Sequence, residues 1–363
     1  MTNKMRNIFY LLLLVTFVAC TSSEKIYNDA CEAKLLGQND KAIQLYEQLI
    51  EKGNSDFLAD AYFELAECYV QVDSVEKSIN AYKEAAMLNH FRAVKVYGDL
   101  LLCLKDKVSE HIELYSALLQ LEPDNDYYAA MLAKPYIFNI HVMNKERAAQ
   151  LMMPFVNKSG TITNYNVHPT GLAFVAHMLA NGSGEYVKST ESALNLVEKA
   201  RKYKPYSEKD MSIDPDALNI LGNFELITDH YMYAINSDNI DRALAYYKEA
   251  VVNHSQYETE EMINKKITIM EDFLVEKSKV KIDCNWWDRE PGDWITYSND
   301  GGFTYIGHTS DSDAMTGYPL SGLPTGWGYG VWEKEHEAFV GKWKNGKPMK
   351  GLYVNSRGET SLL

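Results

Sequence analysis

The sequence predicts a mainly α-helical solenoid followed by a small antiparallel β module. The first observation is a helix pattern that recurs six times within the first 250 residues. The second is a change of composition, because all six tryptophans lie after residue 281, among closely spaced glycines. The third is an apolar fraction of 46%, which argues against disorder. One amphipathic hairpin cannot bury its apolar face alone, so we expect each helical unit to stack on its neighbours.

The chain begins with the pattern of a signal peptide. Lys4 and Arg6 give a positive start, and an apolar run over residues 8–18 follows. This run is too short to span a bilayer as a mature helix, whereas its length suits a cleaved leader. We therefore assign residues 1–19 to a signal peptide.

A cysteine follows this run. A small residue precedes Cys20, and the segment resembles the lipobox of bacterial lipoproteins, with Phe17 where leucine is usual. The resemblance implies a lipid on Cys20, a tether over residues 20–25 and a membrane-anchored place in the bacterial cell envelope, with the outer membrane favoured. The alternative is an ordinary secretory signal with an unrelated cysteine.

Residues 59–90 are the clearest pair of helices. Two apolar stripes at helical spacing are separated by a short polar break at residues 71–74, so we expect two helices that fold back on each other. The first stripe is Tyr62, Leu65, Ala66 and Tyr69, and the second is Ser78, Tyr82 and Ala85.

The second stripe recurs through the chain. Its signature is a small residue, a large apolar residue four positions later and another apolar residue after three more. The six occurrences are Ala42/Tyr46/Leu49, Ser78/Tyr82/Ala85, His111/Tyr115/Leu118, Ala148/Met152/Phe155, Ala193/Val197/Ala200 and Ala243/Tyr247/Ala250. The central anchors at 46, 82, 115, 152, 197 and 247 are 36, 33, 37, 45 and 50 residues apart. The pattern over residues 26–157 resembles the tetratricopeptide repeat, whose period is about 34 residues, and implies a right-handed superhelix.

The later units are longer. Gly171–Phe174, the glycine loop Asn181–Gly184 and the helix Ala193–Lys199 resemble a SEL-type repeat. We therefore assign residues 158–280 to SEL-like repeats and a capping helix. The segment 157–169 has few helix signals and is expected to be a loop between the two halves of the array.

Two further expectations concern helix ends. Pro135 should kink or end the helix that contains it, because proline lacks the backbone N–H. Residues 258–279 should form a terminal cap with a polar outer face. Its expected buried stripe is Ile263, Ile267, Met270 and Leu274.

Residues 281–363 form the β module. The pair Asn345-Gly346 is a strong signal for a type I′ hairpin between aromatic strands. The surrounding segment closely resembles a MORN repeat, with phenylalanine in place of the usual tyrosine. The matching positions are Phe339, Gly341, Trp343, Gly346 and Gly351, and we read them as structural. We also expect the helices to remain folded in a chain that ends near Lys279.

The sequence offers no catalytic or metal-binding constellation. No helix pattern follows the glycines at 326, 328 and 330, although a dinucleotide-binding site requires one. His111 is expected to be packed in its repeat and not to be a ligand. Asp311 and Asp313 lack the later ligands of a calcium loop. The remaining cysteines have no metal-ligand spacing. We expect no metal, no cofactor and, at a net charge of −14, no nucleic-acid partner.

These observations favour a non-catalytic interaction protein that binds a protein or peptide on the solenoid surface. The alternative is a carbohydrate-binding lipoprotein of a nutrient-uptake system. This hypothesis rests on the tryptophan-rich C-terminus, in which Trp286 and Trp287 would stack on sugars. A third hypothesis, an enzyme with a distributed site, has no residue to which a role can be assigned.

Overall fold

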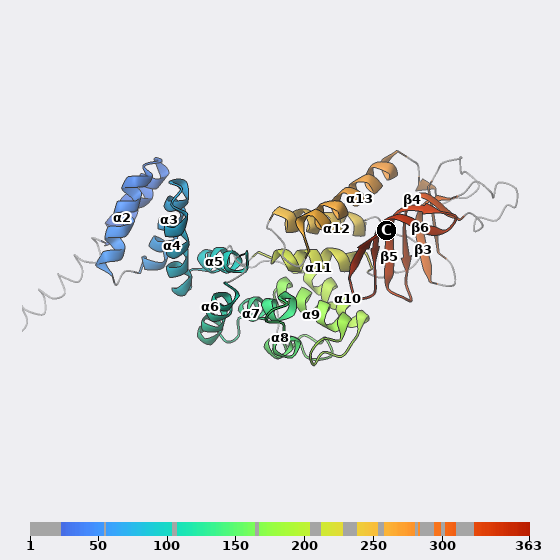
Figure 1. Ribbon diagram of the computed structural model, residues 1–363, viewed down its shortest axis with the longest axis horizontal. Coiled ribbons are helices and arrows are strands. Elements are labelled where there is room, and N and C mark those ends of the chain that lie inside the picture. The colour runs from blue at the N-terminus through green and yellow to red at the C-terminus, as the bar shows by residue number, and fades with distance from the viewer. Residues whose placement is uncertain are drawn as a thin grey trace, which may run out of the picture. The chain divides into compact units, whose positions relative to one another are not determined.

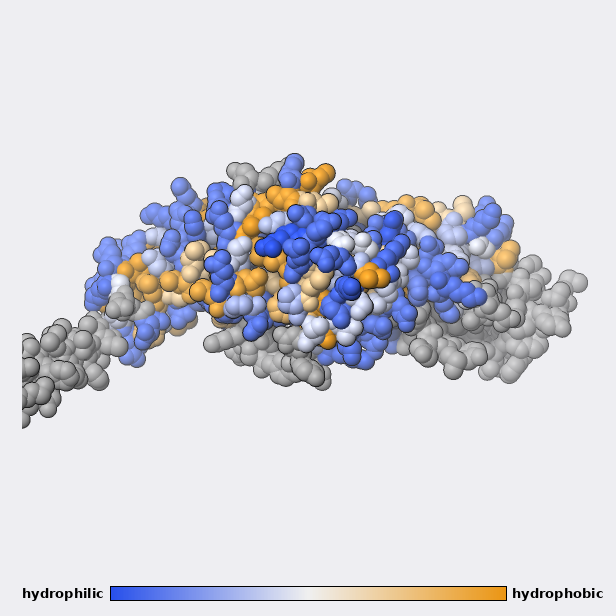
Figure 2. All heavy atoms as spheres, turned by 90° about the horizontal axis from the view of Figure 1, so that it is seen from below, coloured by the Kyte–Doolittle hydropathy of each residue, from blue (hydrophilic) through white to orange (hydrophobic). Residues whose placement is uncertain are grey.

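The computed structural model is mainly helical and ends in an antiparallel sheet, which confirms the predicted fold class (Figure 1). The contacts divide the chain into two compact units, Met1–Pro123 and Asp124–Leu363. The boundary follows Pro123, the proline after the third predicted repeat. The face of the chain that Figure 2 shows is mostly hydrophilic, with groups of apolar side chains between the polar ones. The described residues are 23–53, 56–103, 107–163, 167–203, 212–227, 238–252, 258–279, 282–283, 294–298, 302–309 and 323–363.

The N-terminal unit is a row of short helices in which successive helices pack on each other. A helix over residues 23–35 is followed by α2 (Asn39–Lys52), α3 (Leu58–Gln71), α4 (Val75–Met87), α5 (Phe91–Cys103) and α6 (Val108–Leu121). The predicted break falls between α3 and α4. All residues of the first three repeat signatures are buried, because the tyrosine of each signature fills the space between neighbouring helices. The repeat pattern thus correctly predicted the core of this unit.

The second unit begins with seven helices. They are α7 (Asp126–Phe138), α8 (Lys145–Met152), α9 (Pro169–Asn181), α10 (Thr190–Arg201), α11 (Pro215–Glu225), α12 (Asp238–Val252) and α13 (Glu260–Ser278). The last three repeat signatures are buried here as well. Phe155, however, lies beyond the end of α8, so its helix is shorter than the pattern predicted.

Pro135 and Pro169 have different effects on the helices that contain them. Pro135 does not end α7, which continues for three residues to Phe138. The described parts of the predicted loop, residues 157–163 and 167–168, are not helical, and Val156 and Ile162 form an isolated bridge, but Pro169 already belongs to α9. Proline suits the first turn of a helix, where its missing N–H would have no partner.

The sheet contains seven described strands in sequence order. They are β1 (Ile282–Asp283), β2 (Trp294–Ser298), β3 (Phe303–Thr309), β4 (Pro324–Trp332), β5 (Glu337–Lys344), β6 (Lys347–Val354) and β7 (Thr360–Leu362). The short β1 pairs parallel with β2, and all other pairs are antiparallel. Asn345 and Gly346 both have positive φ, 50° and 77°, and make the predicted hairpin turn between β5 and β6.

Glycines cross the sheet in one row. Gly307, Gly328, Gly341 and Gly351 lie opposite one another on β3 to β6. Aromatic rings fold over this row, since a Cβ on Gly328 would lie 2.2 Å from the hydroxyl of Tyr305 and one on Gly351 would lie 2.8 Å from the ring of Phe339. Such contacts exclude any side chain.

Trp343 is the centre of the aromatic cluster on the same face of the sheet. Its ring contacts Tyr305 and Phe339 edge-on, and its Nε1 donates to the carbonyl of Gly328 at 3.1 Å. Phe339 and Trp343 are thus buried in this cluster, Gly341 and Gly351 lie in the glycine row and Gly346 lies in the hairpin turn, whereas the MORN motif itself stays a prediction.

The opposite face of the sheet packs on helices of the same unit. Tyr329 of β4 is buried and donates to the carbonyl of Leu226, just after α11, at 2.7 Å. Phe273 of α13 contacts the rings of Trp294 and Tyr329. The sheet and the helices of this unit share a core, so the independent folding of a chain that ends near Lys279 stays a prediction.

Helix α13 consequently differs from the predicted cap. Its buried stripe is Ile263, Lys266, Met270 and Phe273, whereas Ile267 and Leu274 are half-buried. The stripe is rotated toward Phe273 because the sheet covers this side of the helix.

We expect Phe273→Ala to lower the free energy of unfolding by about 3–5 kcal/mol, because it leaves a cavity against Trp294 and Tyr329. The matched control is Val275→Ala on the same helix, where the side chain is 52% exposed and the expected change is below about 0.5 kcal/mol. Urea unfolding followed by circular dichroism measures both. Equal midpoints for the two variants would contradict a shared core.

Candidate functional site

Helix α11 is enclosed on all sides. Every residue from Pro215 to Glu225 is buried, although four of these residues are polar or charged. Asp214 precedes the helix and accepts hydrogen bonds from the backbone N–H groups of Asp216 and Ala217. Buried charges require partners, so the neighbours of α11 must supply them.

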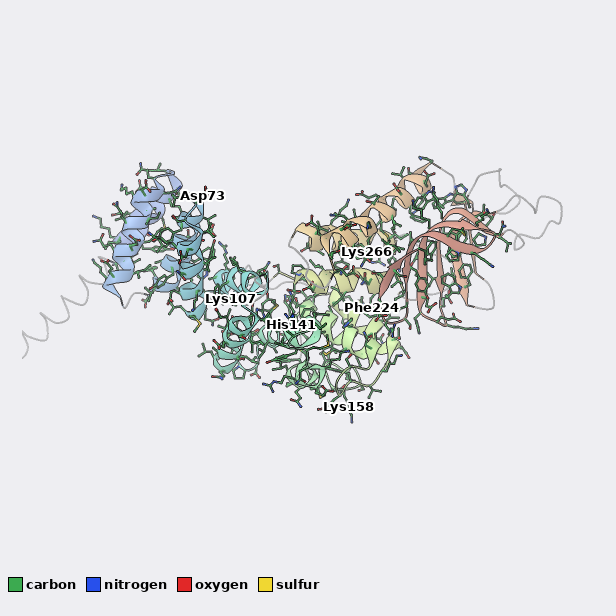
Figure 3. All side chains as sticks on the ribbon, viewed as in Figure 1. Asp73, Lys107, His141, Lys158, Phe224 and Lys266 are labelled. Atoms are coloured by element: carbon green, nitrogen blue, oxygen red, sulfur yellow. The ribbon has the colours of Figure 1, made fainter. Side chains whose placement is uncertain are left out.

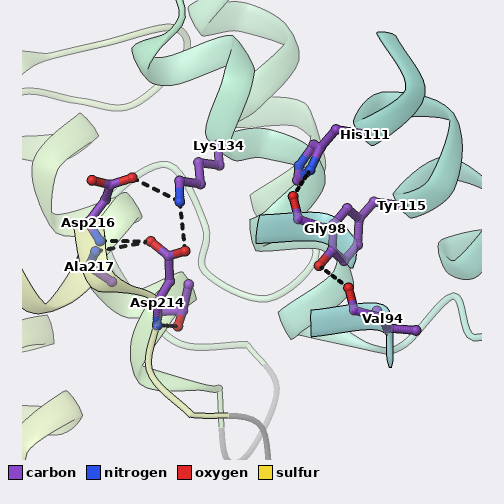
Figure 4. Close-up of polar contacts among 9 residues, drawn as sticks. Val94, Gly98, His111, Tyr115, Lys134, Asp214, Asp216 and Ala217 are labelled. Carbon is purple, nitrogen blue, oxygen red and sulfur yellow. Dashed lines mark hydrogen bonds and ion pairs between the residues drawn. The ribbon is translucent and has the colours of Figure 1, made fainter. Parts of the chain in front are cut away.

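Lys134 of α7 supplies the first partner. Its Nζ lies 2.7 Å from Oδ2 of Asp214 and 2.8 Å from Oδ2 of Asp216 (Figure 4). The backbone N–H of Asp214 donates to Oγ1 of Thr170 on α9 at 3.0 Å. Burial raises the pKa of Asp214, and the ammonium of Lys134 opposes this rise. These contacts fix α7, α9 and α11 relative to one another.

Lys266 of α13 is the partner for the middle of α11. Its Nζ donates to the side-chain oxygens of Asn219 at 3.2 Å and Asn223 at 2.8 Å, and it forms an ion pair with Glu258 (Figure 3). Burial lowers the pKa of Lys266 to about 8. Thr360 of β7 donates to Glu258 at 2.8 Å, so this network also reaches the sheet.

The end of α11 has arginine partners. Glu225 is fully buried, and its Oε2 lies 2.9 Å from Nε of Arg242 and 3.6 Å from a guanidinium nitrogen of Arg201. These arginines come from α12 and α10. Cations from α7, α10, α12 and α13 thus each contact α11 or its capping residue, and we interpret this network as structural.

A cleft of about 310 Å³ opens beside this core. It lies between α7, the start of α8, α9 and the turn that joins β6 to β7. We call its apolar lining residues the floor and its polar lining residues the rim. The lining residues are Ile137, Phe138, Met143, Lys145, His177, Met178, Asn181, Ser183 and Glu359.

The glycine loop after α9 forms one wall of the cleft. Gly182 has a φ of 62° and ends α9, as the sequence predicted for this loop. A Cβ on Gly184 would lie 2.4 Å from the carbonyl oxygen of Lys145, so only glycine permits this approach to α8. Ser183 is held between these glycines at the cleft. Asn181 donates to the carbonyl of His177 at 2.8 Å.

The turn between β6 and β7 supplies the other wall. Oδ1 of Asn355 accepts the backbone N–H groups of Arg357 and Glu359, and its Nδ2 donates to the Glu359 carboxylate. Thr190 of α10 donates to the carbonyl of Ser356 at 3.0 Å. The sheet therefore presents Glu359 at the rim in a fixed orientation.

His177 lies between charges of opposite sign. Burial lowers the pKa of His177 to about 4, the negative charge of Glu359 opposes this shift, and the positive charge of Lys145 adds to it. The ring contacts Phe138, with centroids 5.5 Å apart. At neutral pH the cleft thus combines an ammonium, a carboxylate and a neutral imidazole above an apolar floor. This arrangement suits a ligand with an apolar group and charges of both signs.

Other residues singled out in the sequence do not join this cleft. His111 is buried in the N-terminal unit with Nδ1 3.2 Å from the carbonyl oxygen of Gly98 (Figure 4), which confirms that it is packed. Gly326, Gly328 and Gly330 lie in β4, as expected of strand glycines. Within the described ranges, no group of three His, Cys, Asp or Glu side chains could hold a metal ion.

Several predicted positions fall outside the described residues. They are Cys20, Trp286, Trp287, Asp311 and Asp313. Cys31 and Cys68 are both free; Cys68 is buried and Cys31 is half-buried.

Sequence reasoning missed the cleft and the charges around α11. The run Asp214-Pro215-Asp216 carries the signal of a helix start, with a capping residue before proline. Nothing in it identifies Lys134, which lies 80 residues earlier, as the partner. The cleft joins residues from three regions, so no local motif marks it.

No protein-family model matches the chain, and no curated protein is significantly similar to it. The resemblances to tetratricopeptide, SEL-type and MORN repeats therefore remain predictions. In the part of the chain that the structure describes, no helix is long and apolar enough to cross a membrane.

We expect Lys134→Met to destabilise the second unit by about 3–5 kcal/mol, because it leaves the carboxylates of Asp214 and Asp216 without their cation. The loss should shrink as the pH falls and these carboxylates become protonated. Urea titrations at pH 7 and pH 5 measure the effect. The control is Lys248→Met, which removes a surface ion pair with Glu271 and should cost less than about 1 kcal/mol. Equal losses for the two variants would contradict the assignment.

The lowered pKa of His177 predicts a pH dependence of stability. The unfolded chain binds a proton near pH 6.5, whereas the folded chain resists protonation until about pH 4. Stability should therefore fall between pH 6.5 and 4, by at most about 3 kcal/mol from this group. His177→Gln should remove this part of the slope. Parallel profiles for the wild type and the variant would show that His177 does not contribute.

Proposed function

We propose that the protein is a non-catalytic interaction protein of the bacterial cell envelope, anchored by a lipid on Cys20, and that its cleft binds a peptide segment of a partner protein. The single observation that carries the binding site is the cleft itself. It joins an apolar floor at Phe138 and Met178 to opposite charges at Lys145 and Glu359.

The chemistry of the cleft favours a peptide over a free ion or a purely apolar ligand. A volume of about 310 Å³ suits one or two side chains, at the lower end of the usual range for ligand pockets. Lys145 can bind a carboxylate of the peptide, and a basic group would share the Glu359 carboxylate with Arg357, which already pairs with it. Met143, which is 47% exposed, can cover an apolar side chain in the floor.

Glycan binding is the second candidate. Three aromatic residues on the open face of the sheet are half-buried and could stack on a sugar: Phe303, Trp332 and Tyr353. However, Trp294 and Trp343 are buried in the core, at 0% and 3% exposure. Fewer aromatic faces remain for a sugar than the composition implied, so we place the peptide first.

The test uses a displayed library of seven-residue peptides selected on the purified wild-type protein. We expect enriched peptides to carry an apolar residue flanked by an acidic and a basic residue. Met143→Glu should weaken the best peptide at least about tenfold in calorimetry, because it places a charge against the apolar floor. The control is Val275→Glu, an equally exposed apolar position on α13 outside the cleft.

Two outcomes would count against this proposal. One is enrichment of peptides that bind wild-type protein and Met143→Glu equally well. The other is an absence of peptide binding together with saturable binding of a polysaccharide that Trp332→Phe weakens, which would favour the glycan candidate.

A further inference from the structure

Several contacts define one edge of the N-terminal unit. The ring of Tyr27, near the start of the first described helix, stacks on Phe57 with centroids 5.0 Å apart. Nε2 of His90 lies 3.2 Å from a carboxylate oxygen of Asp60 at the start of α3. These contacts bring together the start of the first described helix, the start of α3 and the turn between α4 and α5. We name this the anchor edge.

The anchor edge continues to the end of α6 and carries exposed apolar side chains. Asn89, in the turn after α4, donates to the carboxylate of Glu122 just after α6 at 2.8 Å. Beside these two residues, Met87 is 52% exposed, Leu88 is 45% exposed and Leu121 is 68% exposed. Three large apolar side chains from two neighbouring helix ends therefore face solvent together.

Cys20 lies close in sequence to the helix that starts at the anchor edge, so a lipid on Cys20 would bring this edge near a membrane. Cys20 precedes Ser23, where the first described helix begins, by three residues. Three residues span at most about 11 Å. This step rests on the proposed lipid on Cys20. A lipid that inserts in the bilayer then holds the start of the helix, and with it the anchor edge, close to the headgroups.

We propose that the anchor edge lies on a neutral phospholipid surface, with Met87, Leu88 and Leu121 at the headgroup level. The edge carries the carboxylates of Asp60 and Glu122 together with exposed basic side chains at Lys25, Lys52 and Arg92, so charge gives it no preference for anionic lipid and the apolar side chains carry the contact. The two chains of the proposed diacylglyceryl group supply the anchoring itself, and the apolar side chains at this depth set how the unit lies on the surface.

The opposite edge provides matched control positions. Consecutive helices are joined there by the turns at residues 36–38 and 72–74, where Asp73 is labelled in Figure 3. Leu36 is 65% exposed and Val75 is 64% exposed on this edge. A helix of 13 residues is about 20 Å long. These side chains are as apolar and as exposed as those of the anchor edge, but one helix length farther from the proposed lipid.

The experiment places the photocrosslinker p-benzoylphenylalanine at position 88 or 121, or at the control positions 36 or 75. The full-length protein, purified with its lipid from a bacterial host, is reconstituted on phosphatidylcholine vesicles. After irradiation, mass spectrometry measures the protein fraction that carries a phospholipid adduct. We expect at least fivefold more adduct at positions 88 and 121 than at 36 and 75.

Intact mass separates failure of this proposal from failure of the anchor. If Cys20 carries its diacylglyceryl group and the two edges crosslink equally, or the control edge crosslinks more, the orientation is wrong while the anchor holds. If the protein carries no lipid, both are wrong. A circular dichroism spectrum identical to that of the wild type verifies that each variant is folded.

Discussion

The second unit depends on the burial of the polar helix α11. A helix with no exposed face leaves its charged side chains without water, and an unpaired charge in such a place is strongly destabilising. Four cationic side chains from four different helices contact the polar groups of α11 and its capping residue: Lys134, Lys266, Arg201 and Arg242. Because each cation must lie within hydrogen-bond or ion-pair distance of one point on α11, the surrounding helices have little freedom in rotation or register.

The same constraint explains how the sheet comes to form part of the cleft. Tyr329 donates a hydrogen bond to the carbonyl of Leu226, just after α11. Gly358 packs closely on α11, because a Cβ at this position would lie 2.9 Å from the ring of Phe224. The sheet is thus fixed against the helical core, and its last turn holds Glu359 at the rim opposite Lys145. Neither the helices nor the sheet contains the cleft alone, so the cleft exists only where the two meet.

The N-terminal unit is built on a different principle. Each repeat places a tyrosine between neighbouring helices, and its buried histidine and tyrosines bond backbone carbonyls or side chains within the same unit. Such contacts are local in sequence, so stability accumulates from neighbouring pairs of helices. A unit held in this way needs no central charged helix, and its exposed helix ends remain available for contact with other surfaces.

The sequence by itself determined the helices, the repeat signatures, the glycine loop at 181–184 and the hairpin at Asn345-Gly346, because each depends on residues within a few positions of one another. The steric role of Gly341 and Trp343 also followed from a local motif. The tertiary structure alone decided that Lys134 pairs with Asp214, that α13 turns Phe273 and not Leu274 inward, and that the sheet shares the helical core. These features depend on contacts between residues 50 to 100 or more positions apart, such as Tyr329 and Leu226. Local periodicity identifies which face of a helix is apolar, but the surface that covers this face is chosen by packing and by the pairing of buried charges.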